Sequence, residues 1–137
     1  MASRTKFENS NEIGCFVKLT NSFCLVADGA SEDLYEAFRT ELDGVPIVPM
    51  SIAGTKMVGR MTAGNSTGLL VPATTTDEEL EVLTNSLPDI KIRKLEEKLS
   101  ALGNCIACND RVALIHPEMD EDTEAAIAEV LNVEVYR

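Results

Sequence analysis

Short apolar stretches flank a polar corner three times along the chain. The corners lie at Asn21, Asn65 and Asn109, which are 44 residues apart. Two short apolar runs joined by a polar residue indicate a hairpin of two strands. A fixed period of this length indicates one supersecondary unit used several times, because a unit so small cannot bury its own apolar face.

An acidic segment with helical spacing follows each predicted hairpin. Apolar residues recur at steps of three and four in three segments, which are residues 31–43, 77–87 and 118–131. This spacing predicts amphipathic helices with one apolar stripe. Oxygen-bearing side chains such as Ser31 and Asp120 stand at the predicted helix starts, where they can accept hydrogen bonds from free amides.

A third short apolar run follows each predicted helix. These runs cover residues 45–48, 90–93 and 133–136, and the second and third alternate apolar with polar residues, as in a half-buried strand. The unit is therefore predicted to be strand, strand, helix, strand. The pattern predicts one α+β repeat domain over residues 1–137, with units of about residues 1–54, 55–103 and 104–137.

The composition predicts a soluble intracellular protein with an aliphatic core. Apolar residues make up 45% of the chain and tryptophan is absent. No apolar run approaches the roughly 20 residues that span a membrane. The start of the chain also lacks the apolar segment of a secretory signal. We therefore expect neither a membrane partner nor a secreted protein.

The net charge of −11 is unevenly distributed. The three predicted helices hold 15 of the 23 acidic residues and only one of the 12 basic residues. A solvated helix face is the simplest explanation. The same acids would repel nucleic acid, so we expect no DNA binding, and RNA contact only at strand-end loops. One basic cluster consists of Lys91, Arg93, Lys94 and Lys98. This cluster could contact RNA or an acidic partner, or it could protect a strand edge, and the sequence favours none of these roles.

Four cysteines and one histidine are the candidates for metal or covalent chemistry. Cys105 and Cys108 have the spacing of half a zinc or redox site. Both fall on a predicted strand, where residues three apart point to opposite faces. For these two, and for Cys15 and Cys24, we expect buried thiols without metal, cofactor or disulfide. No nucleophile or acid is tied to His116 by spacing, so a structural or surface role is expected.

Seven stretches of the chain, in order and without large gaps, closely resemble translation initiation factor six. They are residues 7–16, 51–54, 59–61, 68–72, 85–89, 99–104 and 108–110. The resemblance implies a pentein-type α/β propeller, in which five strand–strand–helix–strand units surround a pseudo-fivefold axis. Three of the five units would be present, so we expect a truncated chain that corresponds to the N-terminal three-fifths of such a protein.

The resemblance also implies a function. Members of that family bind the large ribosomal subunit at its intersubunit face, chiefly through a ribosomal protein near the sarcin–ricin loop and with limited rRNA contact. They prevent joining of the small subunit sterically and accompany late pre-ribosomes. The resemblance thus implies a monomeric, non-catalytic protein without a cofactor, located in the cytoplasm, nucleus and nucleolus.

Two other function classes remain open. One is a pentein-fold amidine-modifying enzyme of the amidinotransferase or arginine hydrolase type. Such an enzyme needs a nucleophilic cysteine with a histidine and acids near the axis, whereas all four cysteines here fall within predicted strands. The other is a generic acidic interaction scaffold. The ordered resemblance favours ribosome binding over both.

Arg60 and Asn104 are the candidates for ribosome binding. Each directly follows a glycine at the start of a predicted unit, and they are 44 residues apart. The repeat should therefore place them side by side on one face near the axis, where a forked guanidinium can bind a carboxylate or carbonyl. A structural role in the loops between units is the alternative. Asn65 and Asn109 are weaker candidates, because a hairpin corner explains them without a partner.

Overall fold

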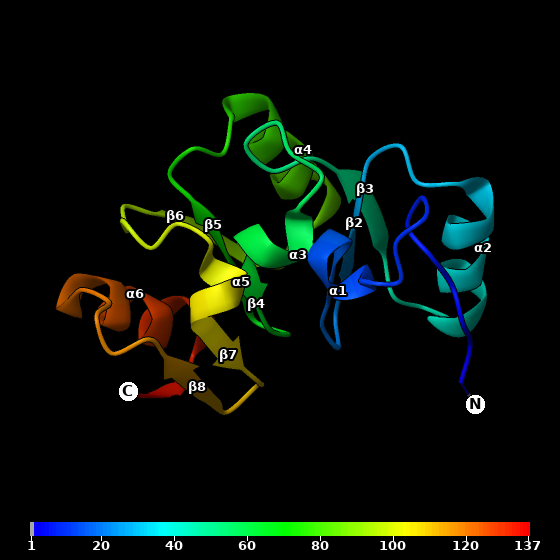
Figure 1. Ribbon diagram of the computed structural model, residues 1–137. Helices are drawn as coiled ribbons and strands as arrows, with labels where there is room; N and C mark the ends of the chain where they lie inside the picture. Colours follow the sequence, from blue (N-terminus) through cyan, green and yellow to red (C-terminus); the bar gives the residue numbers. More distant parts are fainter. Residues whose placement is uncertain (1) are drawn as a thin grey trace.

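The computed structural model describes residues 2–137, and its strands form three separate three-stranded sheets (Figure 1). In each sheet the central strand pairs antiparallel with the strand before it and parallel with the strand after it. The mixed α/β class predicted from the sequence is confirmed. The strands are β1 (Val17–Leu19), β2 (Cys24–Ala27), β3 (Ile47–Met50), β4 (Ala63–Gly64), β5 (Gly68–Pro72), β6 (Lys91–Leu95), β7 (Ile106–Cys108), β8 (Val112–Ile115) and β9 (Glu134–Tyr136).

A helix of ten or eleven residues connects the parallel strands of each sheet. These helices are α2 (Glu32–Glu41), α4 (Asp77–Ser86) and α6 (Glu121–Leu131). Parallel neighbours need such a crossover. Ser31 and Thr76 cap α2 and α4 by accepting from backbone amides, whereas the side chain of Asp120 forms no cap hydrogen bond with any described residue. Between residues 2 and 137, no helix is long and apolar enough to cross a membrane.

Three helices of four residues each precede the hairpins, and the sequence pattern did not predict them. They are α1 (Ile13–Phe16), α3 (Val58–Met61) and α5 (Leu102–Cys105), and they lie side by side in Figure 1. Glycine at the second position of α3 and of α5 lets each of these helices touch the backbone of the helix before it. An ideal Cβ at Gly59 would lie 2.0 Å from the carbonyl oxygen of Gly14, and one at Gly103 would lie 2.2 Å from that of Gly59. A larger side chain would force the helices apart.

The core consists of two clusters of mainly aliphatic side chains. Helix α4 packs against β3 of the first sheet, and α6 packs against β5 and β6 of the second. Consequently Leu25 of β2 and Leu70 of β5 are fully buried. Leu114 holds the corresponding place in β8, opposite Ala107 and Tyr136, but it is 58% exposed. The third sheet therefore has one uncovered face.

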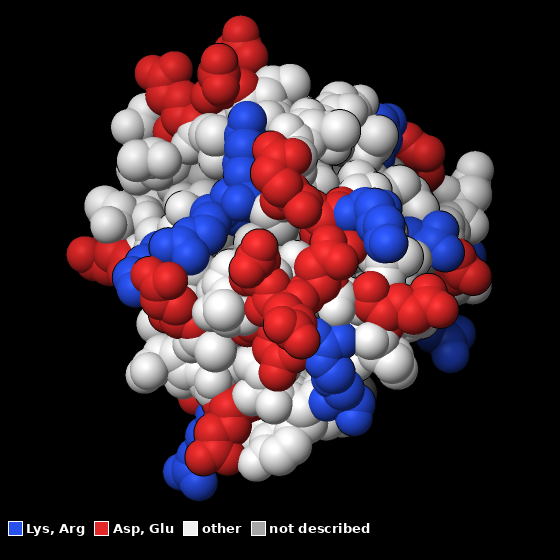
Figure 2. Space-filling model, turned by 90° about the vertical axis from the view of Figure 1, so that its left-hand side faces the viewer, with Lys and Arg blue, Asp and Glu red and all other residues white. Residues whose placement is uncertain are grey.

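Acidic side chains gather on the face that contains α6, with basic side chains beside them (Figure 2). Arg93 of β6 donates two hydrogen bonds of 3.1 Å to Glu129 of α6. The ammonium group of Lys94 lies 4.0 Å from a carboxylate oxygen of Asp77 in α4. Two members of the basic cluster are thus partly neutralised by neighbouring helices, which favours a protected strand edge over an RNA contact.

Candidate functional site

Asn65 and Asn109 cap the hairpin turns in which they lie. The Oδ1 atom of Asn65 accepts hydrogen bonds of 2.9 and 3.1 Å from the amides two and three residues further on. The Oδ1 atom of Asn109 accepts two such bonds of 2.8 Å. An asparagine side chain in this arrangement stabilises a turn locally. The predicted corner positions of these two residues are confirmed.

Thr20, rather than Asn21, occupies the corresponding corner of the first hairpin. Its Oγ1 atom accepts hydrogen bonds of 3.1 and 3.0 Å from the amides two and three residues further on. The amide nitrogen of Thr20 also closes its hairpin as that of Asn65 does. The predicted equivalence of Asn21 with the other two asparagines is therefore wrong. The first corner precedes the second by 45 residues, and an asparagine one position later concealed the difference.

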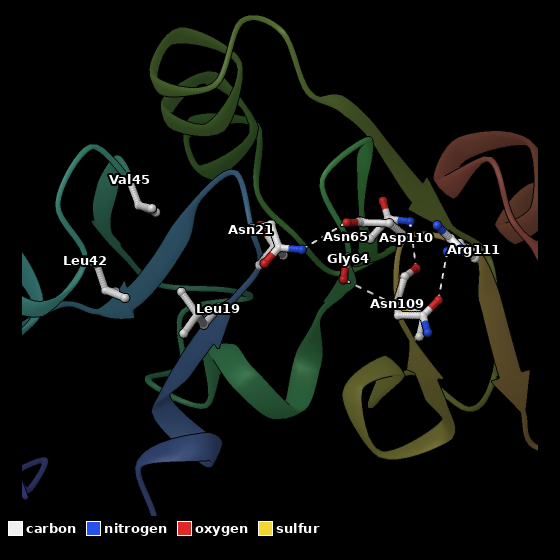
Figure 3. Close-up of a pocket in the computed structure, with 11 residues that line it drawn as sticks. Leu19, Asn21, Leu42, Val45, Gly64, Asn65, Asn109, Asp110 and Arg111 are labelled. Atoms are coloured by element: carbon white, nitrogen blue, oxygen red, sulfur yellow. Dashed lines mark hydrogen bonds between the residues drawn. The ribbon is translucent and has the colours of Figure 1, made fainter. Parts of the chain in front are cut away.

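The residues that follow the three corners meet at one point. The carboxylate of Asp110 accepts hydrogen bonds from the Ser66 amide at 2.7 Å and from the Ser66 hydroxyl at 2.9 Å. It also accepts a hydrogen bond of 3.0 Å from the side-chain amide of Asn21 (Figure 3). These bonds hold the pKa of Asp110 below its ordinary value, and the bond from the Ser66 amide has the largest effect. Asp110 therefore ties the first and second hairpins to the third.

A pocket of about 640 Å³ lies beside these corners. Apolar side chains of Leu19, Leu42 and Val45 form one wall, and the polar corner residues form the other (Figure 3). Asn65 is only 3% exposed, and its Nδ2 group donates to the carbonyl oxygens of Asn109 and Leu131 at 3.1 and 2.9 Å. The side chain of Asn65 is thus used within the fold, which leaves it little capacity to bind a partner.

Arg60 and Asn104 occupy the third positions of α3 and α5, which are neighbouring helices. Both residues are exposed. Among the described residues, neither side chain has a hydrogen-bond or ion-pair partner. The structure therefore places them in adjacent elements as expected, but in short helices instead of loops or strand starts. Cys15 has the same position in α1.

The four candidate residues do not form a single surface. Arg60 precedes β4 and Asn65 follows it, whereas Asn104 precedes β7 and Asn109 follows it. A strand advances about 3.3 Å per residue, so even these short strands separate the members of each pair. Arg60 and Asn104 lie at the end of the hairpins that we call the helix end. Asn65 and Asn109 lie at the opposite end, which we call the corner end.

The thiols are placed differently from the prediction. Cys24 and Cys108 lie on strands, but Cys15 and Cys105 lie in α1 and α5, and only Cys24 is fully buried. Burial raises the pKa of Cys24 to about 11 and also raises that of Cys108. An activated nucleophile needs the opposite shift. Within residues 2–137 there is no disulfide and no cluster of three metal-binding side chains.

His116 lies at the surface directly after β8. Its Nδ1 atom accepts a hydrogen bond of 3.2 Å from the amide of Glu118. Its own amide donates to the carbonyl oxygen of Cys105 at 2.9 Å. These contacts fit the predicted structural or surface role.

A buried carboxylate that the sequence analysis missed holds the loop before α3. Glu79 of α4 is 8% exposed and accepts hydrogen bonds from the Ser51 hydroxyl and from the amides of Ala53 at 2.8 Å, Gly54 at 3.2 Å and Thr76 at 2.9 Å. Burial alone would raise its pKa, but these hydrogen bonds outweigh burial and lower it. The Thr-x-x-Glu pattern at 76–79 indicates a capping box, but it does not indicate the contact with the loop.

A second buried carboxylate, Glu97, lies on the loop before α5 and ties this loop to the start of α6. It is 6% exposed and accepts hydrogen bonds from the amides of Leu99 and Asp120, both at 3.2 Å, and from the Thr123 hydroxyl at 2.8 Å. Burial alone would raise the pKa of Glu97, but its hydrogen bonds lower it. Among these bonds, the one from Thr123 has the largest effect. No local pattern in the sequence marks this residue.

Comparison with known proteins gives one consistent result. Residues 2–137 match the eIF-6 family. The chain is 64% identical to eukaryotic translation initiation factor 6 of Saccharomyces cerevisiae, 60% identical to eukaryotic translation initiation factor 6-2 of Arabidopsis thaliana and 59% identical to eukaryotic translation initiation factor 6 of Drosophila melanogaster. Each alignment covers 100% of the chain and 57% of the relative, so the chain spans somewhat more than half the length of these proteins.

Proposed function

Because the chain belongs to the eIF-6 family, we propose that it acts in translation initiation by binding the large ribosomal subunit at its intersubunit face. The bound protein prevents joining of the small subunit sterically. It also takes part in late assembly of the large subunit, as a monomer present in cytoplasm and nucleolus. The observation that carries this proposal is the family match over residues 2–137, together with identities of 59% to 64% to proteins named as initiation factors.

The proposal includes a pentein-type propeller to which this chain contributes three units, over about residues 1–54, 55–103 and 104–137. The identical strand order of the three sheets supports it, as do the successive contacts between α1, α3 and α5. The uncovered face at Leu114 supports it too, since α4 and α6 cover the corresponding faces of the other two sheets. In the full propeller, the helix of a further unit packs there.

Arg60 and Asn104 are the proposed contacts with the ribosome. Both are exposed, and the donor groups of their side chains make no hydrogen bond with other described residues. Arginine offers five donors in a rigid fork, which suits a carboxylate or carbonyl on a protein. A chain with a net charge of −11 is repelled by RNA and attracted to basic proteins. The proposed partner is therefore a ribosomal protein near the sarcin–ricin loop, with limited rRNA contact.

The proposed action requires no catalysis and no cofactor, because the bound body is itself the obstacle. The competing enzyme hypothesis needs an activated cysteine beside a histidine. The raised pKa values of Cys24 and Cys108 argue against it. So does the imidazole of His116, whose Nδ1 atom is engaged by a backbone amide.

Sedimentation with purified ribosomal subunits tests the proposal. The 137-residue chain should sediment with large subunits and not with small subunits, and saturating amounts should reduce the yield of joined ribosomes. Arg60→Ala should weaken large-subunit binding by about 1–3 kcal/mol without changing the thermal midpoint. Arg111→Ala, which alters an exposed arginine at the corner end, is the matched control and should bind normally.

Two results would contradict the proposal. Failure of the folded chain to sediment with large subunits would remove the function itself. Equal losses for Arg60→Ala and Arg111→Ala would leave binding intact as a function but would remove the helix end as its site.

A further inference from the structure

Both proposed contact residues follow a loop that a buried carboxylate holds in place. The loop after β3 leads into α3 and Arg60, and Glu79 binds it. The loop after β6 leads into α5 and Asn104, and Glu97 lies on this loop and ties it to the start of α6. The first unit differs, because Leu34 stands at the helix position that Glu79 occupies in α4. Carboxylates thus occur at the two junctions that lead to a candidate contact.

Glu79 binds a turn that contains two residues with left-handed backbone. Ala53 and Gly54 have φ values of 52° and 71°, so both lie in the left-handed region, which is costly for alanine. Their successive amides point at the Glu79 carboxylate, at 2.8 and 3.2 Å, and form an anion-binding nest. Ile52 and Thr55 close the turn with two backbone hydrogen bonds of 3.1 and 2.9 Å.

This turn is linked directly to α3. The Oγ1 atom of Thr55 donates to the carbonyl oxygen of Ile52 at 2.9 Å and accepts from the amide of Met57 at 3.3 Å. The carbonyl oxygen of Met57 then accepts hydrogen bonds from the amides of Arg60 and Met61 at 3.1 and 3.0 Å. Hydrogen bonds, together with the short backbone segments between them, therefore connect the Glu79 carboxylate to the backbone of Arg60.

The second junction has a similar hydrogen-bonded arrangement, but the positions of the donor and the carboxylate are exchanged between helix and loop. Thr123 is the third residue of α6, as Glu79 is of α4, and its hydroxyl donates to Glu97 on the loop. The carboxylate of this junction therefore lies on the loop and not on the helix, but each junction contains one buried, hydrogen-bonded acid. The amides of Leu99 and Asp120 complete its set of donors.

We propose that Glu79 is a positioning residue for the Arg60 contact, and that Glu97 has the same role for Asn104. This inference rests on the proposed function. Neither carboxylate touches the ribosomal partner. Each fixes the loop that sets where its short helix presents the contact side chain. Loosening the loop lets α3 or α5 shift, and a displaced guanidinium or amide loses its directional hydrogen bonds.

A double-mutant cycle in large-subunit binding tests the role of Glu79. Glu79→Gln keeps the side chain's shape but turns an NH₂ group toward backbone donors. It should weaken binding about tenfold in the otherwise unchanged protein, and not at all once Arg60→Ala has removed the contact, because residues acting through one another are non-additive. Its effect on the thermal midpoint should be the same in both backgrounds, which separates positioning from stability.

Glu97→Gln is the matched control, because it alters the other buried carboxylate. Its binding loss should disappear in the Asn104→Ala background and persist in full with Arg60→Ala. If Glu79→Gln does not fold, Ser51→Ala removes one hydrogen bond to Glu79 and serves in the same cycle with a smaller effect. Normal binding by folded Glu79→Gln, or additive losses with Arg60→Ala, would overturn the positioning role. Failure of the unchanged chain to bind large subunits would instead refute the proposed function.

Discussion

The two ends of the central hairpins use polar side chains in opposite ways. At the corner end, Asp110 and Asn65 form hydrogen bonds with neighbouring hairpins and turns. At the helix end, Arg60 and Asn104 project from closely packed helices and bind no other described side chain. Buried polar groups are normally satisfied inside the fold, whereas an unused exposed donor is free to bind a partner. The comparison thus separates residues that hold the fold from residues that can act.

The largest expected effect comes from the glycine contacts at the helix end. A Cβ at Gly59 would lie 2.0 and 2.5 Å from the backbone carbonyl oxygens of Gly14 and Val17, which no side-chain rotation can relieve. Gly59→Ala should therefore lower the free energy of unfolding by about 3 kcal/mol in urea titrations. Gly14→Ala is the matched control, since its Cβ would meet nothing within 4 Å. Similar costs for both changes would show that α1 and α3 are not packed so closely.

The next effect concerns the buried asparagine at the corner end. Asn65→Ala leaves the carbonyl oxygens of Asn109 and Leu131 and two turn amides without their partner. We expect a loss of about 2 kcal/mol in the free energy of unfolding, measured by thermal or urea unfolding. Ser22→Ala alters a polar residue in the first hairpin turn whose hydroxyl makes no hydrogen bond with another described residue, and it should cost little. Equal stability of both variants would contradict the structural role of Asn65.

A smaller effect should depend on pH. Hydrogen bonds hold the pKa of Asp110 below its ordinary value of 3.8 in the folded protein. The carboxylate therefore adds stability above its unfolded pKa, and this contribution disappears as the pH falls through the folded pKa. Asp110→Asn should be less stable than the unchanged chain near pH 7, and the difference should shrink in acid. Unfolding titrations between about pH 3 and pH 7 measure it.

Because Glu79 and Glu97 remain in both proteins, the difference between the two proteins isolates Asp110. A difference that stays constant over this range would show that charge at the corner is unimportant.

The sequence predicts the regular elements well, because strands and ten-residue helices extend over enough residues to show a period. Helices of four residues, such as α3, are too short to show a period. The sequence therefore identifies Arg60 as a candidate but does not predict the helix in which it lies. The Asn21 error shows that identical residues at a fixed spacing need not be equivalent. Glu97 could not be found at all, because its partner Thr123 lies 26 residues away and becomes a neighbour only through folding.

The smallest expected effect on stability gives the sharpest test of the comparison, because two asparagines lie at opposite ends of one hairpin strand. Asn104→Ala should change the free energy of unfolding by less than about 0.5 kcal/mol, since its exposed side chain holds no other described residue. It should nevertheless weaken large-subunit binding by about 1 kcal/mol in sedimentation titrations. Asn109→Ala should do the reverse, because it removes two hydrogen bonds of 2.8 Å within its turn and no contact at the helix end. Its cost should be about 1 kcal/mol in stability, with unchanged binding. If Asn109→Ala weakens binding at full stability, or Asn104→Ala unfolds the protein, the assignment of one end to function and the other to structure is wrong.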